Sequence, residues 1–138
     1  MRIIIIGVGE VGFHVAKALT QEDFDITVID IDPKKCRRAT EHLDVIVVEG
    51  NGASAHNLLK AKVDGADYVL TLTRSDEVNL IASQQAHILG AKKIIARLRN
   101  QQYSKRDSII RPEKFGIDLI IHPEKVVCDE IVRLVCHP

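Results

Sequence analysis

The 138-residue sequence is poor in aromatic side chains: they make up 4% of it, and tryptophan is absent. A surface that binds nucleic-acid bases by stacking therefore lacks its usual components. An excess of positive charge is missing as well, because 19 basic residues are balanced by 19 acidic ones. Without the electrostatic attraction on which non-specific nucleic-acid binding depends, we expect no nucleic-acid partner.

Long hydrophobic runs are also absent. The longest, Ile3–Ile6, is far shorter than the roughly 20 residues that a membrane-spanning helix needs. No signal peptide precedes this run. We therefore expect a cytoplasmic domain.

Cysteine is scarce, and Cys36, Cys128 and Cys136 lack the paired spacing of a zinc site or a disulfide framework. The six histidines are scattered along the chain, and no Ser/His/Asp or Cys/His grouping is readable. The sequence therefore predicts no catalytic residue and no metal ligand.

What is present is an alternation of short apolar runs and helical stretches, which is typical of a parallel sheet buried on both faces. The runs predicted as strands are Arg2–Ile6, Ile26–Asp30, Val45–Glu49, Tyr68–Leu72, Lys93–Leu98 and Leu119–Ile121. Joined by right-handed crossovers, they make the doubly wound, six-stranded α/β sheet of a Rossmann fold, in the order 3-2-1-4-5-6. The length fits a single domain over residues 1–138.

Helices are expected at residues 11–19, 33–42, 54–60, 75–89, 103–110 and 124–135. Asp32 and Pro33 suit the N-cap and the first turn of the second helix, and Ser75 or Asp76 would cap the fourth. The last helix carries more apolar surface than a free terminal helix should expose. We therefore expect it to help form a homodimer, and the chain to be one domain of a longer protein.

A G-x-G-x-x-G motif, Gly7–Gly12, follows the first strand and opens the first helix. Gly7 permits a tight turn, Gly9 lets the backbone approach a pyrophosphate, and Gly12 lets helix and strand pack closely. The exposed amides at the start of the helix would then meet the phosphate charge. In this context the motif predicts a dinucleotide site; the alternative is a glycine-rich turn without a ligand.

Asp30 ends the second strand eighteen positions after Gly12. This is close to the spacing of about 20 at which a carboxylate binds the adenosine ribose of a dinucleotide. A carboxylate there repels a 2′-phosphate, and the next residue is Ile31 rather than arginine, so NAD or NADH is favoured over NADP. Asp32 has the same chemistry as Asp30, but we interpret it as the helix cap.

Polar residues also follow the third and fourth strands. Asn51 is predicted either to contact the adenine or to form a plain turn with its glycine neighbours. Thr73 and Arg74 end the fourth strand, across the switch point of the sheet from Gly7. They are predicted to face the second half of the dinucleotide.

Arg97 and Arg99 end the fifth strand, where alternation places both on one face. Arg97 would pair with the pyrophosphate or with the carboxylates of Asp76 and Glu77; the alternative is a solvated surface charge. The full set of candidate cofactor-binding residues is Gly7, Val8, Gly9, Glu10, Val11, Asp30, Asn51, Thr73, Arg74 and Arg97.

With these motifs in place, the sequence resembles the N-terminal nucleotide-binding domain of the Trk potassium-uptake regulators, the KTN or RCK domain. The resemblance covers nearly the whole chain and is carried by Gly7–Gly12, Val28–Asp32, Val48–Gly52 and Thr73–Asn79. Its most specific parts are the block Asp76–Asn79 and the Gly-Asn-Gly sequence Gly50–Gly52.

The resemblance implies a cytoplasmic regulatory subunit, peripheral to the inner face of the membrane. Such a subunit binds NAD(H), or in some relatives ATP in the same site, and gates a membrane potassium transporter or channel. Relatives that use ATP often carry arginine at the position of Glu10, so the acidic residue is more similar to NAD-responsive members. The resemblance further implies domains that pair and assemble into rings, often followed by a small C-terminal ligand-binding domain.

Two other functions are compatible with a Rossmann domain. The cofactor domain of an NAD-dependent dehydrogenase needs a proton-transfer residue beside the nicotinamide, typically His, Lys or Tyr, and residues 73–79 offer none. An NADP-linked reductase needs a phosphate-binding arginine that Ile31 and Asp32 do not supply. We therefore predict a ligand-binding regulator and not an enzyme.

Overall fold

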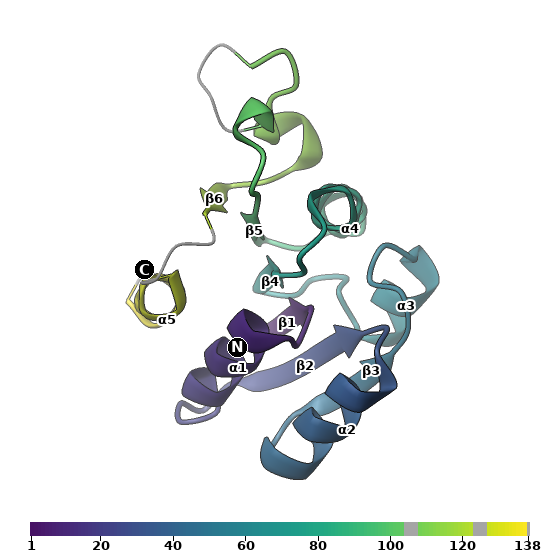
Figure 1. The fold of residues 1–138 in the computed structure, drawn as a ribbon, viewed down its shortest axis with the longest axis vertical. Coiled ribbons are helices and arrows are strands. Elements are labelled where there is room, and N and C mark those ends of the chain that lie inside the picture. Colours follow the sequence, from purple (N-terminus) through teal and green to yellow (C-terminus); the bar gives the residue numbers. More distant parts are fainter. Residues whose placement is uncertain (104–107, 123–126, 138) are drawn as a thin grey trace.

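The computed structural model describes residues 1–103, 108–122 and 127–137, and these contain a six-stranded, all-parallel sheet (Figure 1). The strands are β1 (Arg2–Ile6), β2 (Asp25–Asp30), β3 (Ile46–Glu49), β4 (Tyr68–Thr71), β5 (Lys93–Arg97) and β6 (Leu119–Ile121). Their order, β3-β2-β1-β4-β5-β6, confirms the predicted Rossmann topology. Each strand begins and ends within one residue of its predicted bounds.

Helices cover both faces of the sheet (Figure 1). One face carries α1 (Glu10–Leu19), α2 (Pro33–His42) and α5 (Val127–Cys136), and the other carries α3 (Ala55–Lys60) and α4 (Asp76–Ile88). Strand β1 lies at the centre and contributes to both cores, because successive side chains point to opposite faces. Ile3 and Ile5 join the first core and Ile4 and Ile6 the second, and all four are at most 1% exposed.

Polar residues begin α2 and α4, as predicted. The Asp32 carboxylate accepts a hydrogen bond from the Lys34 amide at 2.9 Å, and the Ser75 hydroxyl accepts one from the Val78 amide at 3.2 Å. Helix α1 differs, because it begins after Gly9 and has no side-chain cap. The start of α1 is therefore built from backbone alone, at the carboxyl edge of the sheet.

The helix predicted at residues 103–110 needs correction. Residues 104–107 lie outside the described part, and the chain on either side forms only the 3-10 turn η1 (Gln101–Tyr103) and an irregular segment at 108–111. The Ser108 hydroxyl bonds the carbonyl oxygens of Gln102 and Ile110. Such local side-chain bonds compete with a helical ladder, and a second 3-10 turn, η2 (Pro112–Phe115), then begins at a proline.

The last helix, predicted at residues 124–135, is described over Val127–Cys136. Its predicted first residues, 124–126, lie outside the described part. Part of its apolar face is covered by the chain itself, because Ile131 and Val135 pack toward α1 and are at most 1% exposed, whereas Val132 and Leu134 are only half-buried. Figure 1 shows α5 beside α1 on the same face of the sheet. The contribution of this helix to a homodimer stays a prediction.

Within the residues that the structure describes, no helix combines the length and the apolar character needed to cross a membrane.

Candidate functional site

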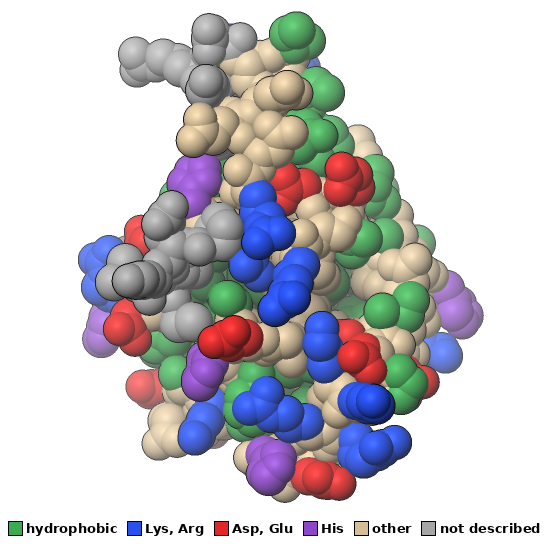
Figure 2. Space-filling model, in the orientation of Figure 1, with side chains coloured by type: hydrophobic (Ala, Val, Ile, Leu, Met, Phe, Trp, Pro, Cys, Tyr) green, Lys and Arg blue, Asp and Glu red, His purple; other side chains and the backbone are tan. Residues whose placement is uncertain are grey.

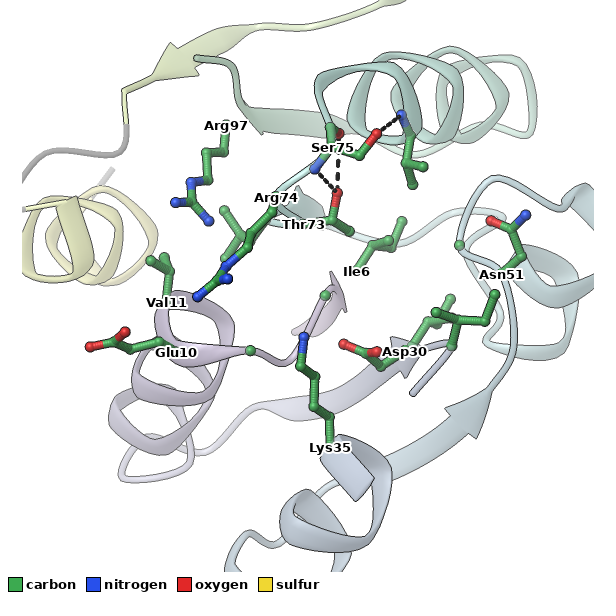
Figure 3. Close-up of a pocket in the computed structure, with 17 residues that line it drawn as sticks. Ile6, Glu10, Val11, Asp30, Lys35, Asn51, Thr73, Arg74, Ser75 and Arg97 are labelled. Atoms are coloured by element: carbon green, nitrogen blue, oxygen red, sulfur yellow. Dashed lines mark hydrogen bonds between the residues drawn. The ribbon is translucent and has the colours of Figure 1, made fainter. Parts of the chain in front are cut away.

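A pocket of about 410 Å³ opens at the carboxyl ends of the strands. It lies between β1 and β4, where the strand order reverses and where open α/β sheets bind their ligands. Its volume is within the range of small-molecule sites, about 300–1,000 Å³. The predicted residues that line it are Gly7, Gly9, Glu10, Val11, Asp30, Asn51, Thr73, Arg74 and Arg97 (Figure 3).

The three glycines of the loop have different roles. Gly7 has a φ of 95°, and a Cβ added there would lie 2.8 Å from the Thr73 nitrogen. A Cβ on Gly12 would lie 1.8 Å from the Gly7 carbonyl oxygen, so the packing of the chain itself requires both glycines. Gly9 has an ordinary φ of −71°, and a Cβ there would contact only the Lys35 side chain, at 3.6 Å. Neither its φ nor the space around it requires a glycine at this position, which leaves an open approach to the start of α1.

Asp30 connects the end of β2 to the loops on either side of it. Its Oδ2 accepts a hydrogen bond from the Val8 amide at 2.8 Å, and its Oδ1 accepts one from the Asp32 amide at 2.9 Å. Each carboxylate oxygen has a second lone pair and can also accept a ribose hydroxyl. Val8, the predicted site residue that does not line the pocket, has its side chain in the core at 1% exposure.

Asn79 fixes the loop after β4, because all the hydrogen-bonding positions of its side-chain amide are used. Its Oδ1 accepts hydrogen bonds from the amide and the hydroxyl of Thr73, at 3.0 and 2.7 Å. Its Nδ2 donates to the carbonyl oxygens of Thr73 and Arg97, at 3.0 and 2.7 Å. The Thr73 hydroxyl therefore donates inside the protein and not toward the pocket, and β4 is tied to the end of β5.

Arg97 lines the pocket and is only 9% exposed, so the alternative of a solvated surface charge was wrong. The carboxylate of Asp76, one of its two predicted partners, accepts hydrogen bonds from the amides of Arg99 and Asn100, at 2.8 and 2.7 Å. Asp76 thus holds the segment that follows β5. A contact between Arg97 and a pyrophosphate stays a prediction.

Asn51 forms a turn and also lines the pocket. Its Oδ1 accepts a hydrogen bond from the Ala53 amide at 2.8 Å, which confirms the turn alternative for that oxygen. The next residue, Gly52, lies against β1, because a Cβ there would be 2.3 Å from a methyl carbon of Ile6. Contact between the remaining Asn51 amide group and adenine stays a prediction.

Over residues 3–123, the sequence matches the TrkA-N domain family. The chain belongs to this family. It is 42% identical to the Trk system potassium uptake protein TrkA of Halomonas elongata, over all of this chain and 30% of that protein. It therefore spans about a third of that relative's length.

Solved structures share the fold at low sequence identity. The TrkA-N domain of the inner membrane protein ybaL from Escherichia coli superimposes with a TM-score of 0.77 at 18% identity, covering 97% of this chain and 96% of that one. The GsuK channel bound to NAD superimposes with a TM-score of 0.73 at 18% identity, covering 87% of this chain and 21% of that one. The predicted family resemblance is confirmed.

One charged residue of the TrkA-N pocket was missed from the sequence. Lys35 lies in the first turn of α2 and extends toward Gly9 (Figure 3). Its position five residues after Asp30, just beyond the carboxyl end of β2, was the signal that could have found it. Apolar walls were not predicted either, and they come from Ile6, Ile29, Ile31, Leu72 and Val78.

The pocket of this TrkA-N domain is weakly basic. The cations Lys35, Arg74 and Arg97 line it together with two carboxylates, those of Asp30 and Glu10. Figure 2 shows basic side chains gathered on the face of the molecule that is turned toward the viewer. A chain with no net charge thus places an excess positive charge where an anionic ligand would lie.

Cys36 lies behind the pocket, where its thiol donates to the carbonyl oxygen of Asp30 at 3.3 Å. Burial raises the pKa of this thiol, and the nearby Asp30 carboxylate raises it further. It is therefore protonated at neutral pH and unsuited to act as a nucleophile. No group of three or more His, Cys, Asp or Glu side chains in the described ranges is arranged to hold a metal ion.

Proposed function

We propose that this TrkA-N domain binds NAD or NADH in the pocket above its glycine loop. The observation that carries the proposal is Gly9, whose missing side chain is explained neither by packing nor by its φ angle. A ligand that approaches the backbone closely supplies the reason. A structural neighbour, the GsuK channel, is known with NAD bound.

The charges around the pocket favour a dinucleotide over nucleotides with more phosphate. Asp30 would accept the ribose hydroxyls, and its charge disfavours a 2′-phosphate as in NADP. Glu10, an exposed residue in the first turn of α1, would add negative charge near a third phosphate, so ATP is the weaker ligand of the same site.

The domain would act as a cytoplasmic regulatory part of a Trk-type potassium transport system. This proposed role is supported by the similarity to a Trk system potassium uptake protein, of which this chain covers 30%. In this proposal the domain works within a larger protein or homo-oligomer, next to a membrane transporter or channel subunit.

The position of the pocket suggests how ligand could change the conformation. Asp30 and Lys35 belong to the half of the sheet that holds β1, β2 and β3, whereas Arg74 and Arg97 belong to the half that holds β4, β5 and β6. A dinucleotide would bridge the two halves. Potassium flux would respond if the ligand binds one arrangement of the assembled domains more tightly than another.

A dehydrogenase is the alternative, and a turnover assay separates the two functions. The described residues that line the pocket include neither His nor Tyr, and their lysine, Lys35, lies on the adenosine side. We expect no NADH oxidation above background when the purified protein is incubated with a panel of carbonyl substrates. Steady NADH oxidation that co-purifies with the protein would contradict the proposed regulatory function.

A further inference from the structure

Lys35 and Arg74 approach the glycine loop from opposite sides of the pocket. Lys35 comes from α2, and its Nζ lies 3.6 Å from the position that a Cβ on Gly9 would take. Arg74 follows β4, in the other half of the sheet. Figure 3 shows both side chains extending into the space above the start of α1.

Neither cation is neutralised by a neighbouring side chain of the described chain. The one ion pair found among the described residues joins Lys92 to Asp67, on a different part of the surface. Asp30, a carboxylate that lines the pocket, accepts hydrogen bonds from backbone amides with both oxygens. Two like charges that face one pocket repel each other unless an anion lies between them.

We propose that Lys35 is a specificity-determining residue that, together with Arg74, clamps the diphosphate of an adenine nucleotide. This inference rests on the proposed function and extends it. A phosphate at the start of α1 would receive charge-assisted hydrogen bonds from the Lys35 ammonium on one side and the Arg74 guanidinium on the other. The clamp recognises the number of phosphates, whereas Asp30 recognises the ribose.

The position of Nζ selects the diphosphate over a 2′-phosphate. The ammonium lies beside Gly9, at the helix start, and it makes no ion pair with Asp30, the residue beside which the ribose hydroxyls would lie. NADPH and NADH therefore meet Lys35 through the same diphosphate. Removal of Lys35 should weaken the two ligands by the same factor.

Calorimetry with ADP, AMP, NADH and NADPH tests the clamp in three variants. Lys35→Gln and Arg74→Gln remove one cation each, and Lys34→Gln is the matched control, because Lys34 is exposed and does not line the pocket. We expect Lys35→Gln to weaken ADP and NADH about tenfold and AMP less, so that the preference for ADP over AMP shrinks. Arg74→Gln should act in the same direction, and Lys34→Gln should match the wild type.

The outcomes distinguish a failure of the clamp proposal from a failure of the proposed nucleotide-binding site. If the wild type binds none of the four nucleotides, the proposed function fails. If the wild type binds but folded Lys35→Gln keeps its ADP and NADH affinities, or loses AMP affinity to the same extent, only the clamp is overturned. If Lys35→Gln weakens the binding of NADPH alone, Lys35 contacts the 2′-phosphate instead of the diphosphate, which also overturns the clamp.

Discussion

Asp30 shows how one side chain can serve both the fold and the site. Its carboxylate accepts hydrogen bonds from two loop amides and faces the pocket. Asp30→Ala should weaken NADH binding by about 1–3 kcal/mol, because a hydrogen bond to a charged group is lost. It should also lower the free energy of unfolding, since the Val8 and Asp32 amides lose their acceptor.

Asp32→Ala is the matched control for this change. Asp32 caps α2 and does not line the pocket, so its loss should cost about 1 kcal/mol of stability and leave the NADH affinity unchanged. Calorimetry and urea unfolding measure the two effects. An unchanged dissociation constant in folded Asp30→Ala would remove Asp30 from the site.

The sequence identified Asp30 because strand ends and spacing are local properties. It did not identify Lys35, because the reach of a long side chain depends on where α2 lies relative to the glycine loop. It also did not show that Asn79 uses all four of its hydrogen-bonding positions, since the partners come from segments far along the chain.

At the scale of elements, the buried parallel strands were the most predictable part, because their apolar runs are nearly continuous. The segment after β5 was not predictable, because it is polar, and side-chain bonds such as those of Ser108 determine its conformation. The apolar face of α5 was recognised, but its partner was not. Periodicity shows that a face is buried and does not show which element covers it.

The connection between β4 and β5 should depend on Asn79. Asn79→Ala leaves the Thr73 amide and the Arg97 carbonyl without their partner, so we expect a loss of about 1–3 kcal/mol in the free energy of unfolding. NADH affinity should fall as well, because the Thr73–Arg74 loop loses its support. Asn100→Ala is the control, because Asn100 is exposed and its side chain accepts a single hydrogen bond, from the Gln102 amide.

Chemical denaturation and calorimetry on both variants check this role. Equal stability of Asn79→Ala and the wild type would show that the hydrogen-bond network around Asn79 does not hold the two strand ends together.

At the scale of the whole molecule, we expect a homodimer or a larger assembly, with α4 contributing to the contact. Ile81 and Ile88 are 41% and 73% exposed, and their spacing of seven residues places them on one side of the helix. Light scattering should give at least twice the chain mass of 15.4 kDa, and Ile88→Glu should lower it. A monomer at all concentrations would contradict the assembly.

Small-angle scattering with and without NAD and NADH tests the coupling of that assembly to ligand. If the domain is a regulator, we expect the scattering curve to change when NAD or NADH binds, because gating requires two arrangements with different affinities. A curve that stays the same at saturating ligand would leave the gating mechanism without support.

The central claim is that the open approach at Gly9 is where a dinucleotide binds, and NADH calorimetry on the wild type and Gly9→Ala tests it most directly. A Cβ at this position makes only ordinary contacts, so the stability should change by less than about 1 kcal/mol. We predict that the wild type binds one NADH per chain and that Gly9→Ala, equally folded, binds it at least about tenfold more weakly, since the added methyl group occupies the approach to the helix start. A wild type that binds no NADH, or a folded Gly9→Ala that binds it equally well, would contradict the account.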